Sequence, residues 1–235
     1  MYTAQKLAHA LQQLANTAIA THSQRFFKTG PGEYGEGDLF LGIRVPVLRK
    51  QARIFKTMPA SEVVQALHSP HHEIRLCALL VWVLQFQKAN DSDKKIIYDL
   101  YMANTRYVNN WDLVDTSAHP IVGGYLQDKS RDPLVRLAQS DLLWERRIAM
   151  IATYHFIKQS DFQDALRVAG ILVADPQDLI QKAVGWMLRE VGNRNGSLER
   201  AFLKAHYRDM GRTALRYAIE KFPPEERLRW QSGKI

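Results

Sequence analysis

An indole and a carboxylate, Trp111 and Asp115, lie four residues apart in the sequence. In a helix, these two side chains project from one face, one turn apart. Further along the chain, Lys182, Trp186 and Arg189 have the spacing i, i+4 and i+7, which again defines one helical face. A carboxylate beside indole rings can stabilise positive charge that develops on a substrate. We therefore predict a groove with two indole rings, one carboxylate and a row of cations. The cations that complete this row are Arg147, Arg212 and Arg216.

Each of these residues also has a purely structural interpretation. Tryptophan is more often part of a core than of a site, and both alternatives stay open for Trp111 and Trp186, which have polar neighbours. Asp115 could instead form an ion pair with Arg147. Other residues with chemically useful side chains are assigned to structural roles. They are Trp82 and Trp144 in the core and Asp112 at a helix start.

Other kinds of catalytic or metal site are not indicated. The cluster of His68, His71 and His72 has no cysteine or carboxylate that completes a metal site at ligand spacing, so we expect neither a metal nor a cofactor. No glycine-rich phosphate loop follows a strand, and Gly30–Gly37 is interpreted as a flexible connection. Cys77 is the only cysteine and lies within an apolar run. We therefore expect a buried thiol and a protein of the reducing cytoplasm.

Apolar residues recur with the period of a helix through most of the chain. Leu7, Leu11 and Leu14, for example, mark one apolar face. Proline, glycine and asparagine interrupt the pattern at short intervals, and several prolines stand where a helix can begin. The pattern predicts roughly a dozen short helices and no strands. Two of the helices are expected to have N-caps at Ser61 and Asp161.

Similar segments recur at an interval of about 30–36 residues, which is typical of paired-helix repeats of the HEAT and armadillo type. Glu73–Leu76 is similar to Glu145–Ile148, and Lys182–Glu190 is similar to Arg212–Glu220. We therefore predict an all-α fold, a right-handed solenoid that forms a single domain over residues 1–235. The second helix of each pair would line a basic concave groove. An irregular helical bundle is the alternative.

The charge of the chain favours an anionic partner. The 235 residues carry a net charge of +8, and the pI is about 9.6. Nucleic acid is the commonest polyanion that such a protein binds. The longest apolar stretch, Leu76–Leu84, is far shorter than the ~18 residues that a membrane helix needs. The polar residues Gln5, Lys6 and His9 argue against a signal peptide.

Four segments resemble the AlkD-type DNA alkylation repair glycosylases. They are Gly42–Pro46, Asn110–Asp115, Trp144–Arg147 and Gln181–Glu190, and they follow in the same order and spacing between about residues 40 and 221. The Trp-x-x-x-Asp and Gly-Trp-x-Leu-Arg-Glu motifs together are fairly specific for this family, although either motif alone would be weak evidence. The N-terminal third agrees less well with the family.

The resemblance implies a HEAT-like fold and a monomeric enzyme that excises N3- and N7-alkylated purines from duplex DNA in base excision repair. When the roles of the family's residues are carried over to the matching positions, the catalytic roles fall on Trp111, Asp115 and Trp186. The DNA contacts fall on Arg147 and Arg189. The remaining cations that we expect to contact DNA are Arg44, Lys182, Arg212 and Arg216.

One carboxylate suits such a reaction. Alkylation at N3 or N7 makes the purine cationic, so the base departs neutral and needs no general acid. The positive charge then moves to the deoxyribose, where Asp115 could stabilise it and orient the attacking water. The resemblance also implies that the base need not be flipped into a pocket. Neutral lesions such as uracil are therefore expected to be poor substrates.

Two other functions remain open. The first is a non-catalytic relative that binds branched or damaged DNA, although such relatives tend to lack the catalytic residues that this chain has. The second is a HEAT-type scaffold whose groove binds a peptide or a partner helix. Release of bases from methylated duplex DNA would distinguish the enzyme from both alternatives.

Overall fold

Helices make up most of the structure. The computed structural model describes residues 1–234, and in that range the only extended pairing is an isolated bridge between Leu39 and His71. The all-α prediction is confirmed. The helices form two units, Met1–Ile121 and Val122–Ile235. Among the described helices, none is long and apolar enough to cross a membrane.

The first unit is built around α5 (His72–Phe86), most of whose residues are buried. The helices that pack most extensively against it are α3 (Val45–Ile54), α4 (Ala60–Leu67) and α7 (Trp111–Ala118). Its burial on nearly every side explains why its sequence is continuously apolar. The other elements are α1 (Ala4–Gln12), α2 (Thr17–Phe26), α6 (Asp91–Ala103), the 3-10 turn η1 (Thr105–Tyr107) and η2 (His119–Gly123), a π-helical turn that follows α7.

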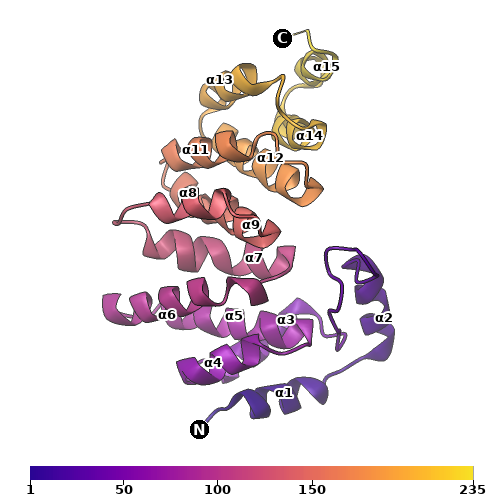
Figure 1. Cartoon of the computed structure of the whole chain (residues 1–235), viewed down its shortest axis with the longest axis vertical. Helices are drawn as coiled ribbons and strands as arrows, with labels where there is room; N and C mark the ends of the chain where they lie inside the picture. Colours follow the sequence, from indigo (N-terminus) through magenta and orange to yellow (C-terminus); the bar gives the residue numbers. More distant parts are fainter. Residues whose placement is uncertain (235) are drawn as a thin grey trace. The chain divides into compact units, whose positions relative to one another are not determined.

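The second unit is a stack of helical pairs (Figure 1). In each pair a first helix packs against a second, and the second helices lie side by side. The pairs are α8 (Asp132–Ala138) with α9 (Leu143–Ala152), α11 (Gln163–Leu172) with α12 (Asp178–Gly192), and α13 (Gly196–His206) with α14 (Arg212–Ala218). The shorter elements are α10 (Tyr154–Ile157), η3 (Ile219–Lys221) and the terminal helix α15 (Pro224–Ser232).

The spacing of the second helices agrees with the predicted repeat. The helices α7, α9, α12 and α14 begin at Trp111, Leu143, Asp178 and Arg212, at intervals of 32, 35 and 34 residues. Each interval accommodates one helix pair and its two connections. The right-handed solenoid over the whole chain stays a prediction.

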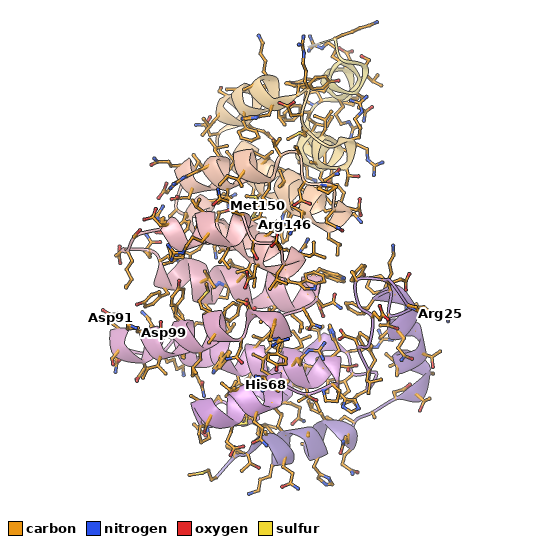
Figure 2. All side chains as sticks on the ribbon, viewed as in Figure 1. Arg25, His68, Asp91, Asp99, Arg146 and Met150 are labelled. Carbon is orange, nitrogen blue, oxygen red and sulfur yellow. The ribbon has the colours of Figure 1, made fainter. Side chains whose placement is uncertain are left out.

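The same kind of side-chain hydrogen bond fixes the start of α5, α9 and α12. Arg75, Arg146 and Gln181 are each the fourth residue of their helix, and each donates to the backbone carbonyl six residues earlier, at 3.0, 2.9 and 3.1 Å. Arg146, labelled together with the buried Met150 in Figure 2, also donates from Nε to Oδ2 of Asp175 at 2.7 Å. The bond attaches α9 to the loop that precedes α12. These side chains satisfy carbonyls of the connecting loops that would otherwise lack a protein partner.

The two predicted N-caps are wrong. α4 begins at Ala60, so Ser61 is already helical and exposed. α11 begins at Gln163, and the carboxylate of Asp161 accepts a hydrogen bond from the Arg131 guanidinium at 2.6 Å instead of capping the helix. An ion pair with a distant residue has therefore replaced the local capping interaction.

Candidate active site

The start of α7 is fixed by the buried side chain of Asn110. Its Oδ1 accepts a hydrogen bond from the backbone N–H of Trp111 at 2.8 Å, and its Nδ2 donates to Oδ2 of Asp38 at 3.4 Å. Asn110 thus caps the helix and attaches it to a loop that precedes α3. Trp111 is the first helical residue, so its position is set directly by this cap.

Two phenylalanines at the end of α2 form an aromatic wall beside Trp111. The rings of Phe27 and Trp111 stack with centroids 5.2 Å apart and planes at 15°, and Phe26 meets Trp111 edge-on at 6.1 Å. Phe27 also stacks on Phe40 at 5.1 Å. Phe26 is 58% exposed, which is unusual for so large an apolar side chain. No sequence pattern links either phenylalanine to Trp111, because α2 lies far from Trp111 along the chain.

A buried network of charges lies behind this aromatic wall. His72 contacts Asp112 through Nε2 at 2.8 Å and Asp38 through Nδ1 at 3.3 Å, and Arg75 donates to Asp38 at 2.7 Å. Burial opposes the charge on His72, but the Asp112 charge and the two carboxylate contacts outweigh it and raise the pKa of His72 to about 9. The histidine is therefore a cation at neutral pH, and it joins the first turn of α7 to the first turn of α5.

Asp115 follows Trp111 by one turn, as the spacing predicts. Trp111 and Asp115 are both half-buried, whereas Leu113 and Val114 between them are buried in the core. Behind Asp115, the hydroxyl of Tyr101 lies 3.0 Å from Oγ of Ser117. Burial, followed by the charge of Asp115, raises the pKa of Tyr101, so this phenol stays protonated. Asp115 therefore lies near an uncharged phenol.

The segment before α3 is held by Glu73. Its carboxylate accepts hydrogen bonds from the backbone N–H groups of Leu41, Gly42 and Ile43 at 2.9, 2.7 and 3.2 Å. Gly42 has a φ of +79°, and a Cβ there would lie 2.1 Å from a backbone oxygen, so only glycine fits. Arg44 follows as the N-cap residue of α3 and is exposed.

In the second unit, α12 carries the predicted stripe of Lys182, Trp186 and Arg189. All three are half-buried, whereas the residues between them are buried, as the spacing predicts. Nζ of Lys182 lies 2.7 Å from Oδ2 of Asp178, and Arg189 is paired with Glu220. The buried residues are Ala183, Val184, Gly185, Met187 and Leu188.

The other predicted cations of the second unit differ in exposure. Arg147 is only 5% exposed, and its guanidinium donates to the backbone carbonyl of Leu179 in α12. This contact gives Arg147 a structural role at the start of α12. Arg212 is exposed and donates to the hydroxyl of Tyr207 at 3.3 Å. Arg216 is also exposed, one turn further along α14.

The side-chain burial on α7 and α12 agrees with the predicted one-face spacings, and one of the structural assignments is corrected. Trp82 and Cys77 are fully buried, as expected. Trp144 is half-buried rather than part of the core. Asp112 does lie in the first turn of a helix, but it binds the buried His72. The prediction that α7 and α12 contribute to one groove joins residues of the two units and stays a prediction.

Comparison of the chain with known protein families identifies its family. The model of the DNA alkylation repair enzyme family matches residues 7–222, and the chain belongs to that family. None of the curated proteins compared with the chain matches it.

Two solved structures share the fold. A predicted DNA alkylation repair enzyme from Enterococcus faecalis is 16% identical, with a TM-score of 0.69 over 89% of this chain and 97% of that chain. The protein smu.31 from Streptococcus mutans UA159 is 15% identical, with a TM-score of 0.53 over 92% of this chain and 95% of that chain. At such identities the likeness concerns the helical fold alone.

Proposed function

We propose that this protein is a DNA glycosylase that excises positively charged N3- and N7-alkylated purines from duplex DNA. The observation that carries the proposal is the arrangement on α7, where a half-buried indole and a half-buried carboxylate lie one turn apart. The indole is braced by Phe27, and the helix start is fixed by His72 and Asn110. Such bracing is what a preorganised site requires.

The proposed reaction needs one acidic side chain. The bond between C1′ of the deoxyribose and the purine nitrogen breaks, and its electron pair moves to the cationic base, which leaves neutral. Asp115 stabilises the positive charge on the sugar. Water then adds to C1′, and its proton is taken up by Asp115 or by solvent. The electron-rich face of Trp111 attracts the same positive charge, a contact worth about 0.5–2 kcal/mol.

In this proposal the exposed and half-exposed cations hold the DNA backbone. Lys182 and Arg189 are paired with carboxylates of the protein, so phosphates would have to compete with Asp178 and Glu220 for them. Trp186 adds a second indole for the sugar. Arg147 remains a proposed DNA contact, although it is only 5% exposed and also donates to the carbonyl of Leu179 in α12. The remaining cations assigned to phosphates are Arg44, Arg212 and Arg216.

The test is the substitution Asp115→Asn, measured as release of 7-methylguanine from methylated duplex DNA. Loss of the charge should lower the rate by a factor on the order of 10²–10³, and DNA affinity should be nearly unchanged. Asp128→Asn, at an exposed carboxylate, is the matched control and should release bases at the wild-type rate. Full activity of the Asp115 variant would end the catalytic assignment.

The same assay tests the non-catalytic alternative. A wild-type protein that releases no base, yet binds a four-way junction more tightly than duplex DNA, would be a binding protein of the same family. If it neither releases bases nor binds DNA tightly, the scaffold alternative would gain support.

A further inference from the structure

A concave surface lies in the first unit, where the end of α3, the end of α5 and the beginning of α6 meet. It forms a groove of about 720 Å³. The groove has an apolar floor to which Leu84, Ile96 and Ile97 contribute. Ile96 is 48% exposed, so a ligand that covers it would bury apolar surface.

The rim of this groove is basic. Arg53, Lys56 and Lys88 line it and are exposed. Among the described residues that line the groove, Asp93 is the one acidic side chain. The cations come from different segments of the first unit: α3, the turn that follows α3, and the turn after α5. The groove therefore combines an apolar floor with a positive rim.

Hydrogen bonds hold one wall of the groove in place. The side-chain amide of Gln85, near the end of α5, donates to the backbone carbonyls of Lys56 at 3.0 Å and Met58 at 2.8 Å. Phe55 and Met58, in the same turn, are buried beneath it. The groove is thus preformed, which lowers the cost of binding a ligand.

We propose that this groove binds an acidic, amphipathic segment of a partner protein. Leucine or phenylalanine side chains of such a segment would cover Leu84 and Ile96, while its carboxylates would meet Arg53 and Lys88. Duplex DNA matches the rim but not the floor, because placing its charged phosphates against apolar side chains would remove water from the phosphates without any compensating contact. A helix lying in an apolar groove is a common mode of peptide recognition.

The groove and the proposed active site lie at opposite ends of α5. His72, which contacts α7, is the first residue of this helix, whereas Gln85, which lines the groove, is its second-to-last residue. A helix rises 1.5 Å per residue, so the two ends are about 20 Å apart. A peptide in the groove therefore leaves Trp111 and Asp115 uncovered, and the protein can bind its partner and its substrate together.

The experiment uses the full-length protein and a phage-displayed library of random 16-residue peptides. Selection on the wild-type protein is combined with counter-selection on Ile96→Glu, which changes an exposed side chain and should fold normally. We expect the enriched peptides to be acidic and to contain leucine or phenylalanine. Their affinity, measured by fluorescence anisotropy, should fall at least tenfold in Ile96→Glu and in the double variant Arg53→Glu/Lys88→Glu.

Two controls make this result specific to the groove. Lys204→Glu changes the charge at an exposed position of the second unit and should alter peptide affinity less than twofold. A version of the best peptide with lysine in place of glutamate should bind the Arg53→Glu/Lys88→Glu variant better than it binds the wild type. Circular dichroism verifies that each variant is folded, and the rate of base release at saturating DNA should be unchanged in all of them.

The proposal is overturned if no enriched peptide loses affinity in Ile96→Glu, or if the enriched peptides are basic. It is also overturned if reversal of Arg53 and Lys88 weakens duplex DNA binding and leaves peptide binding intact. That outcome would assign the rim to DNA.

Discussion

At the scale of single residues, the neighbours His72 and Glu73 explain how the proposed active site is held. Glu73 accepts three backbone hydrogen bonds from Leu41, Gly42 and Ile43, and His72 contacts Asp112 in α7. Both residues are nearly fully buried. A buried charge is tolerated only when it is paired or hydrogen-bonded, so the loop before α3 and the start of α7 are each specified by one side chain of α5.

The raised pKa of His72 predicts a particular dependence of stability on pH. Its value in the folded protein, about 9, lies above the unfolded value of 6.5. The stabilisation is therefore fully present below pH 6.5 and is lost as the pH rises through about 9. Between pH 6 and pH 9, urea unfolding should show a loss of about 2–3 kcal/mol that is absent in His72→Gln. His9→Gln, at an exposed position, should lose stability with rising pH as the wild type does. A pH dependence in His72→Gln like that of the wild type would contradict the assignment.

Phe27 should matter for activity through Trp111. Aromatic pairs contribute about 0.5–1.5 kcal/mol beyond the area that they bury, so Phe27→Ala should slow release of 7-methylguanine by up to about tenfold. Phe27→Tyr keeps a ring against the indole and should retain most of the activity. Equal rates for both variants would mean that the stacked rings do not position Trp111.

At the scale of helices, the packing of α12 against α14 depends on Gly185. A Cβ at this position would lie 2.3 Å from the backbone oxygen of Ala214 and 2.5 Å from Cβ of Tyr217. Alanine favours a helix by about 1 kcal/mol over glycine, but the clash must separate the two helices. Gly185→Ala should therefore lower the free energy of unfolding by about 1–3 kcal/mol.

A second glycine provides the matched control for this prediction. Gly170 lies in α11, and a Cβ there would have no neighbour within 4 Å. Gly170→Ala should raise the free energy of unfolding by roughly 0.4–1 kcal/mol. Both variants can be compared by urea denaturation, where a stabilised Gly185→Ala protein would show that α12 and α14 are not packed as closely as described.

The sequence predicted these helices better than it predicted what holds them. The period of the apolar residues and the intervals between α7, α9, α12 and α14 depend on local patterns, and both agree with the structure. The one-turn spacing of Trp111 and Asp115 is likewise local. The contacts of Trp111 with Phe27 and of Asp112 with His72 are not local in the sequence, because α2, α5 and α7 meet only after folding. The predicted cap at Asp161 failed for the same reason, because Arg131 binds it from elsewhere in the chain.

At the scale of the whole molecule, the net charge of +8 makes any DNA binding dependent on salt. Two contributions to the affinity for DNA can be distinguished. A general attraction of the basic protein to DNA would be weakened about equally by loss of any exposed cation. A direct contact with a phosphate instead releases a bound counterion, which changes the slope of log K against log salt concentration.

Arg212 and Arg216 allow the two contributions to be separated. Both are exposed on α14, one turn apart, and the proposed function places them on phosphates. The double variant Arg212→Gln/Arg216→Gln should reduce the magnitude of the salt slope by about 2, one unit for each lost contact. Lys204→Gln and Lys129→Gln, which remove the same kind of charge at other exposed positions, should leave the slope within about 0.5 of the wild-type value. Fluorescence anisotropy with a short methylated duplex between about 50 and 200 mM salt measures the slopes of the wild type and of the three variants. If the control variants reduce the slope as much as the double variant, α14 makes no specific contact with the DNA backbone.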